Sequence, residues 1–110
     1  MFDGTFFPRI QCNDGFSMSV QARDGCYCEP RNDAGPWSAV EVGFPSEREG
    51  LLMEWAEEAD RPTETVYGWV PLRIIKAVIA LHEGTNEEGL AVLKAIENGG
   101  SFLDRFKRES

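Results

Sequence analysis

The residues that could support catalysis or bind a metal are one histidine and three cysteines. His82 follows an apolar segment, where a lone histidine is more often a partly buried or capping residue than a general base. Cys26 and Cys28 alternate along a candidate strand, so both thiols would share one face, and Cys12 could approach them. With His82 as a fourth ligand these residues could bind zinc, but C-x-C spacing is a weak zinc signal. We therefore expect no catalytic residue, no metal and no cofactor.

A second set of candidates comes from the alternation in residues 16–22, FSMSVQA. A period of two predicts a half-buried strand with a small, polar outer face. If the neighbouring strands align with it, that polar face would carry Ser17, Ser19, Gln21, Glu41, Tyr67 and Trp69. Hydroxyl groups beside aromatic rings suit a binding surface, and Arg31 at its border could hold a phosphate or carboxylate. A solvated sheet face shielded by its aromatic residues, or a homodimer interface, would explain the same pattern.

Acidic residues are concentrated in the middle of the chain. The net charge is −8, from 19 acidic and 11 basic residues, and residues 41–60 contain seven acids opposed only by Arg48. The chain lacks the basic footprint of a nucleic-acid-binding protein, so we expect no direct nucleic-acid contact. Acidity of this kind favours solubility or a basic partner. The carboxylates that we expect to contact a partner are Glu47, Glu49, Glu54, Glu57 and Glu58.

Length and composition indicate one domain, residues 1–110, in an aqueous compartment. No apolar run approaches the roughly 20 residues needed to span a bilayer, so we expect no membrane partner. The start, MFDGTFFPRI, lacks the features of a signal peptide. An odd number of cysteines without an export signal indicates free thiols in the cytoplasm.

Four strands are predicted, at residues 5–12 (regular only from 9), 16–22, 37–44 and 63–70. Within 26–31 a further short strand is a candidate, ended by Glu29-Pro30. In residues 37–44, Val40, Val42 and Phe44 would share a face, and in residues 63–70 Tyr67 would share a face with Trp69. Asn13-Asp14-Gly15 has the composition of a hairpin turn.

Three helices are predicted, two of them from capping boxes. Ser46 with Glu49 would begin a helix that ends near residue 60, and Thr85 with Glu88 would begin one that ends at Gly99-Gly100. Between them, a helix from Pro71 to about Glu83 would end at Gly84, and a short turn is expected in 101–108. The predicted fold is therefore α+β, with an antiparallel sheet of about four strands in the N-terminal two-thirds and C-terminal helices packed on one face.

The segments FSMSVQA, YCEPR, VEVGFPS and RPTETVYGWVP, followed by an apolar helix, resemble a group of small proteins encoded by bacteriophages and prophages of proteobacteria. Their shared pattern is SVQA…YC.PR…VEVG.P…T.TVYG.VP. The resemblance covers residue 10 to about residue 84, so residues 85–110 look like a helical extension. It implies no specific activity, but small acidic phage proteins are often accessory factors, with antagonists of host defence prominent among them.

These observations favour a non-enzymatic, cytoplasmic binding protein that antagonises a host defence complex, such as a CRISPR effector, through its acidic surface. The first alternative is an oligomeric sponge that sequesters a nucleotide immune signal, with a ligand site formed by Ser19, Gln21, Arg31, Tyr67 and Trp69. A phosphate site needs positive charge, and the predicted sheet region offers only Arg9, Arg23 and Arg31. The charge distribution therefore favours the antagonist over the nucleotide sponge. A structural or housekeeping phage protein, and an enzyme that uses Cys26, Cys28 or His82, are the remaining alternatives.

Overall fold

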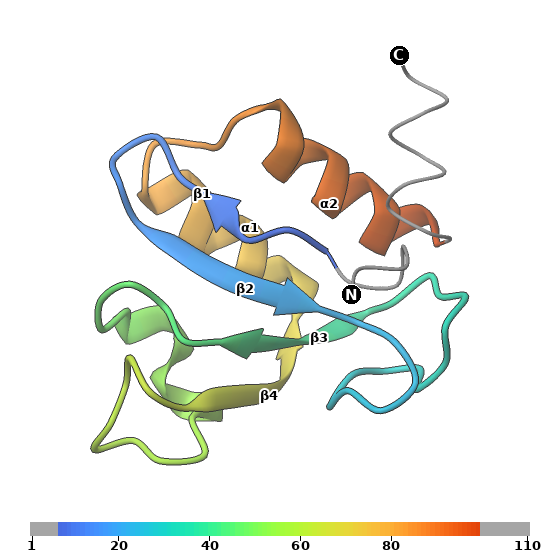
Figure 1. The fold of residues 1–110 in the computed structure, drawn as a ribbon, viewed down its shortest axis with the longest axis horizontal. Coiled ribbons are helices and arrows are strands. Elements are labelled where there is room, and N and C mark those ends of the chain that lie inside the picture. Colours follow the sequence, from blue (N-terminus) through green and yellow to red (C-terminus); the bar gives the residue numbers. More distant parts are fainter. Residues whose placement is uncertain (1–6, 100–110) are drawn as a thin grey trace.

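The computed structural model describes residues 7–99 and has an α+β fold, as predicted (Figure 1). An antiparallel sheet in the order β1-β2-β3-β4 is followed in the sequence by two α-helices. The elements are β1 (Ile10–Gln11), β2 (Ser17–Gln21), β3 (Ala39–Gly43), the 3₁₀ helix η1 (Gly50–Trp55), β4 (Val66–Pro71), α1 (Leu72–Leu81) and α2 (Glu87–Asn98). Neither helix is long and apolar enough, within residues 7–99, to pass through a membrane.

All four predicted strands form, with different bounds. Of the strand predicted at 5–12 only Ile10–Gln11 is regular, and residues 5–6 lie outside the described residues. β4 begins later than predicted and ends one residue later, at Pro71. Val20 pairs with Val42, and both side chains are fully buried, whereas Gln21 and Glu41 pair on the opposite face and are half-buried. The predicted hairpin turn at Asn13-Asp14-Gly15 joins β1 to β2, and its Gly15 adopts a φ of 101°. A residue with a side chain rarely adopts that φ, so glycine suits this position.

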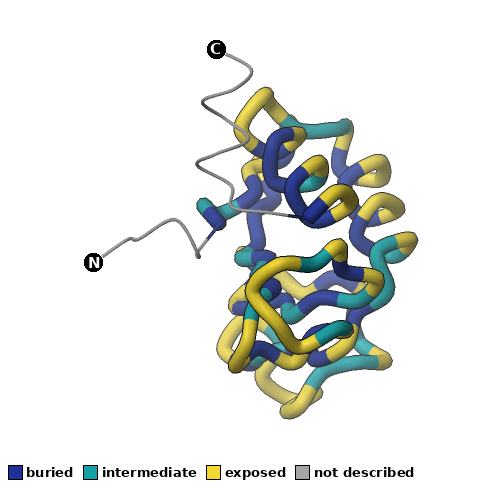
Figure 2. Tube along the Cα trace, turned by 90° about the vertical axis from the view of Figure 1, so that its right-hand side faces the viewer, coloured by how far each residue is buried: buried dark blue, intermediate teal, exposed yellow. Residues whose placement is uncertain are grey.

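The apolar core lies between the inner face of the sheet and the helices. Both helices bury the side chains that recur at helical spacing, and α2 contacts the β1 region while α1 contacts β4. Figure 2 shows that buried residues line the inside of the fold and that exposed residues follow its outer loops. Each fully buried valine or isoleucine stabilises the fold by about 1.5–3 kcal/mol relative to an exposed one. The helix residues in this core are Ile75, Val78, Ile79, Ala91, Val92, Ala95 and Ile96.

A β-bulge interrupts the pairing of β3 with β4. Val40 pairs with Val70, but Val42 pairs with Tyr67, so Gly68 and Trp69 together oppose the single residue Glu41. The extra residue reverses the alternation along β4. Tyr67 consequently points into the core and is fully buried, whereas Trp69 is 49% exposed and has a φ of 55°. The prediction that these two aromatic residues share a face is therefore wrong.

Two further predictions about strands are wrong. Phe44 does not continue the inner face of β3, because its φ of 48° turns the chain outward and leaves its side chain 50% exposed. Residues 26–31 do not form a strand, since they pair with β3 only through an isolated bridge between Glu29 and Ala39. The backbone N–H of Tyr27 does not bond to a strand backbone but donates to the Glu41 carboxylate at 2.9 Å.

The helix predicted from Ser46, which Gly50 was expected to shorten, forms only as the 3₁₀ helix η1 and does not begin at Ser46. Ser46 is not its cap, since its hydroxyl accepts a hydrogen bond from Ser17 N–H at 3.0 Å, and Glu49 caps η1 through Leu51 N–H instead. After Trp55 the chain extends and pairs Ala56 with Tyr67 at the edge of β4. Pairing with that strand edge competes with helix continuation and ends η1.

The C-terminal helices form as predicted, except that α2 has a different N-cap. Asn86, not Thr85, caps α2 by accepting a hydrogen bond from Gly89 N–H at 2.9 Å, while the Thr85 hydroxyl donates to Gln11 C=O at 2.6 Å. Gly84 closes α1 through a hydrogen bond from its N–H to Ile79 C=O at 2.8 Å. The turn predicted in 101–108 lies outside the described residues.

Candidate functional site

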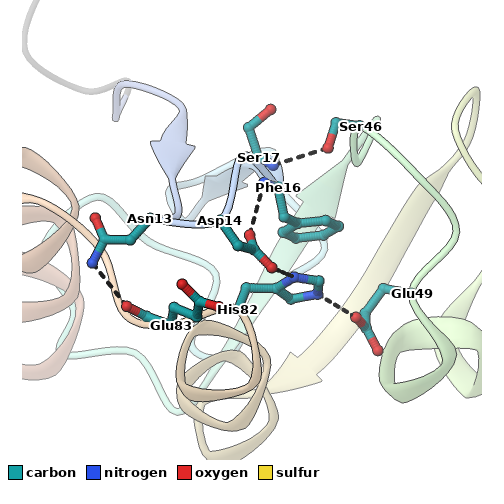
Figure 3. A network of polar contacts seen from close by, with 8 residues as sticks. All are labelled: Asn13, Asp14, Phe16, Ser17, Ser46, Glu49, His82 and Glu83. Atoms are coloured by element: carbon teal, nitrogen blue, oxygen red, sulfur yellow. Dashed lines mark hydrogen bonds and ion pairs between the residues drawn. The ribbon is translucent and has the colours of Figure 1, made fainter.

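The single histidine lies at the centre of a partly buried polar network (Figure 3). His82 follows the last turn of α1 and is 8% exposed. Its Nδ1 lies 2.7 Å from Asp14 Oδ2, and its Nε2 lies 2.6 Å from Glu49 Oε1. The imidazole also stacks on Phe16, with ring centroids 4.2 Å apart and planes 13° from parallel. The network joins residues from three distant parts of the chain.

The geometry of this network favours a charged imidazole. An ionised carboxylate only accepts hydrogen bonds, and a neutral imidazole has one N–H, so two such contacts require both ring nitrogens to be protonated. Burial by itself lowers the pKa of His82, but the hydrogen bonds and negative charges of Glu49 and Asp14 outweigh it and raise the pKa above 6.5. The pKa of Asp14 is lowered, chiefly by the Phe16 N–H, and also by His82.

Each carboxylate of the network is positioned by its own backbone contact. Asp14 Oδ1 accepts a hydrogen bond from Phe16 N–H at 3.0 Å within the β1–β2 turn. Glu49 Oε2 accepts one from Leu51 N–H at 3.0 Å at the start of η1. Asn13 Nδ2 adds a hydrogen bond to Glu83 C=O at 2.8 Å. The network therefore ties the first hairpin, η1 and the end of α1 together, and neither ring nitrogen of His82 is left to accept a proton.

The three cysteines are buried and form no disulfide within residues 7–99. Burial raises the pKa of all three, that of Cys26 to about 11. A thiol must ionise to act as a nucleophile or metal ligand, so these cysteines are poorly suited to either role near neutral pH. Within residues 7–99, no three histidine, cysteine or acidic side chains form a group that could hold a metal ion.

The polar face of the sheet is partly covered by the N-terminal segment, through the side chain of Arg9 and the backbone of Phe7. Arg9 Nε donates to Ser17 Oγ at 2.9 Å. Gln21 accepts from Phe7 N–H at 2.8 Å and donates to Phe7 C=O at 2.7 Å. These polar groups satisfy one another, so the β1–β2 part of the face offers few free hydrogen-bonding groups.

The five residues predicted to bind a nucleotide do not form one site. Tyr67 lies in the core, where its hydroxyl donates to Pro62 C=O at 2.6 Å. The Gln21 amide is bonded to Phe7, as described above, and Arg31 is an exposed loop residue. Ser19 and Trp69 lie on the outer face, Ser19 half-buried and Trp69 exposed.

An exposed aromatic pair, Tyr27 and Trp69, occupies the outer face at β4. The ring centroids are 5.0 Å apart and the planes are 28° from parallel. Tyr27 is 37% exposed, and its carbonyl accepts a hydrogen bond from Trp69 N–H at 2.9 Å. No sequence pattern indicates a role for Tyr27, because the residue is placed by its backbone contact with Trp69 at the bulge. The glycine at position 68, inside a predicted strand, was the one sequence feature that could have indicated a close neighbour here. In the structure an added Cβ at Gly68 would lie 3.1 Å from Tyr27 Cβ.

The acidic residues of the middle segment divide into two groups. Glu49 is buried in the His82 network, so the prediction that it contributes to an exposed acidic surface is wrong. The other four predicted carboxylates are exposed, and we call them the acidic edge: Glu47, Glu54, Glu57 and Glu58. Residues 57 and 58 are fixed beside the start of β4, because Glu57 N–H donates to Val66 C=O at 3.0 Å and Glu58 N–H donates to the preceding Thr65 Oγ1 at 3.1 Å.

No protein-family model matches this chain, and neither a curated protein nor a solved structure matches it.

Proposed function

We propose that this chain is a non-enzymatic binding protein whose acidic edge contacts a basic surface of a partner protein complex. The observation that supports this most directly is the uncompensated charge of that edge. Among residues 7–99, no ion pair neutralises any of its four carboxylates, although Lys76 pairs with Glu97 and Arg61 with Glu64. Such a surface attracts a basic partner over several ångströms and accelerates its association.

The backbone contacts of the acidic edge strengthen this proposal. Because Glu57 and Glu58 lie on a segment bonded to β4, their backbone is ordered before any partner binds. Binding through a preorganised segment costs less conformational entropy than binding through a free loop. The acidic edge therefore suits recognition better than the same charges on a flexible tail would.

The resemblance to phage proteins motivates a more specific partner. We propose a host defence complex, such as a CRISPR effector, whose nucleic-acid-binding surface is basic. The acidic edge would occupy that surface in place of nucleic acid. A cytoplasmic location, with three free thiols, would be consistent with such a partner.

Two observations support a binding role over catalysis. Both nitrogens of His82 contact carboxylates, so the histidine is poorly placed to act as a general base. The thiols are buried and have raised pKa values. The alternative of a nucleotide sponge has less support, because its predicted ligand residues do not converge.

The test is capture of a host complex from a proteobacterial lysate, followed by affinity measurement with the purified complex. Simultaneous Glu54→Lys, Glu57→Lys and Glu58→Lys substitutions should weaken binding at least about tenfold, as expected when several rim charges are reversed. The matched control reverses Glu29, Glu83 and Glu88, which are exposed on other parts of the fold and give the same net charge. Equal affinity of the two triple variants for the complex would contradict a role for the acidic edge.

A further inference from the structure

We infer that the Tyr27–Trp69 pair, together with Glu41, binds an arginine side chain of the partner protein. This inference rests on the proposed function and specifies its recognition chemistry. The site lies on the sheet face opposite the helices, where Gly68 and Trp69 oppose Glu41 across the bulge. The site is separate from the acidic edge. Both adjoin β4, because Trp69 belongs to that strand and Glu57 N–H bonds to Val66 at its start.

The aromatic pair is exposed and also held in place. Trp69 exposes about half of its surface, although burial of a tryptophan is strongly favourable. Its backbone N–H is bonded to Tyr27 C=O at 2.9 Å, and its ring stacks on that of Tyr27. Tyr27 packs over Gly68, where a larger residue would displace it. A rigid, solvent-facing aromatic pair is the kind of anchor that protein interfaces use.

The charge next to the pair favours a cation as its occupant. Glu41 Oε1 accepts the Tyr27 N–H at 2.9 Å, and within residues 7–99 no hydrogen bond uses Oε2. The face of an indole ring attracts cations, and so does the acidic edge, whose Glu57 bonds to Val66 at the start of the same strand. A nucleotide phosphate would be repelled by the same carboxylates.

Among protein cations, arginine fits these groups better than lysine. The guanidinium group is planar, is weakly hydrated and stacks on aromatic faces, while its N–H groups can donate to a carboxylate. The ammonium group of lysine is compact and strongly hydrated, so it gains less from a ring face. The predicted occupant is therefore an arginine of the basic partner, stacked on Trp69 and paired with Glu41.

The test uses octa-arginine and octa-lysine peptides, which carry equal charge, titrated into the full chain by calorimetry at low salt. We expect octa-arginine to bind the wild type more tightly and to shift the indole N–H resonance of Trp69. Trp69→Ala should weaken octa-arginine binding by about 5- to 30-fold, the range expected for a partly desolvated cation–π contact, and affect octa-lysine less. Glu41→Gln, which keeps an acceptor for Tyr27 N–H, should also reduce the preference for arginine.

Phe44→Ala is the matched control, because Phe44 is an equally exposed aromatic residue with a similar positive φ. It should leave both peptide affinities unchanged. Equal binding of the two peptides to the wild type, absence of binding, or equal losses in Trp69→Ala would overturn the inference. So would tighter binding of adenosine monophosphate at Trp69, which would indicate a nucleotide site, or a dimer that Trp69→Ala dissociates, which would indicate a second copy.

The peptide experiment also separates this inference from the proposed function. The triple variant of the acidic edge should weaken both peptides to a similar extent, because it removes charge without affecting stacking. If that variant captures the host complex as well as the wild type does, the proposed function fails. The preference for arginine at Trp69 is measured as the difference between the affinities for octa-arginine and octa-lysine. That difference does not depend on whether the host complex is captured.

Discussion

Nε2 of His82 lies 2.6 Å from Oε1 of Glu49, which joins the end of α1 to the residue that caps η1. The two residues are 33 positions apart, and both side chains are buried. A buried carboxylate without a partner is costly, so this contact and the second one to Asp14 make His82 a structural centre of the fold.

The stability of this protein should decline as the pH rises through the pKa of folded His82. The pKa of folded His82 is raised above 6.5, so its contribution to the free energy of unfolding is complete below about pH 6.5 and is lost as the pH rises through the folded value. Urea denaturation between about pH 6 and pH 9 should show a steeper decline for the wild type than for His82→Gln. Parallel pH profiles of the two proteins would contradict the charged network.

A second pH dependence should appear in acid. The pKa of Asp14 is lowered from 3.8, so its stabilising contribution is present above that value and is lost as the pH falls through the lowered folded value. Asp14→Asn should therefore flatten the acid limb of the stability profile while leaving a pH dependence from the contact of His82 with Glu49. An unchanged acid limb would show that other carboxylates determine it.

The pKa of His82 can be measured directly, because it is the only histidine in the chain. Titration of its imidazole protons by NMR should give a pKa above 6.5, and Glu49→Gln should lower that pKa by removing one hydrogen-bonded charge. Glu83→Gln, at an exposed neighbouring position, is the control and should have little effect. A wild-type pKa below 6.5 would mean that burial dominates.

Tyr67 should contribute to stability without contributing to ligand binding. Tyr67→Phe removes the hydrogen bond to Pro62 C=O and should reduce the free energy of unfolding by about 0.5–1.5 kcal/mol. Because the ring is buried, octa-arginine affinity should match that of the wild type. A loss of peptide affinity at unchanged stability would assign Tyr67 to the binding surface instead.

The thiols should react slowly in the folded protein. All three are buried with raised pKa values, so iodoacetamide near pH 8 should modify the native chain far more slowly than the chain unfolded in urea. Intact mass measured over time would count the modified thiols. Rapid modification of one thiol in the native protein would identify an accessible, activated cysteine and would reopen an enzymatic role.

Much of the fold could be predicted from local sequence patterns. Alternation in FSMSVQA and WSAVEVGF predicted two central strands, and the apolar spacing of residues 72–81 predicted α1. Asn13-Asp14-Gly15 predicted the hairpin turn. These features depend on side-chain periodicity and on the conformational preference of individual residues, both of which are local.

The candidate sites were less predictable, since each depends on long-range contacts. Glu49 looked like one carboxylate among several in an acidic segment, and only the packing of α1 against η1 brings it to His82. The Ser46 capping box failed because Ser17 N–H, 29 positions away, binds the Ser46 hydroxyl.

The sequence by itself determined the periods of the strands and helices, the net negative charge and the polar character of one sheet face. Only the tertiary structure decided which residues occupy the two faces of β4, because the bulge at Gly68 and Trp69 arises from pairing with β3. One additional residue in that pairing moves Tyr67 into the core and exposes Trp69 beside Tyr27. Pairing register is a property of two strands together, so the pattern within either strand does not contain it.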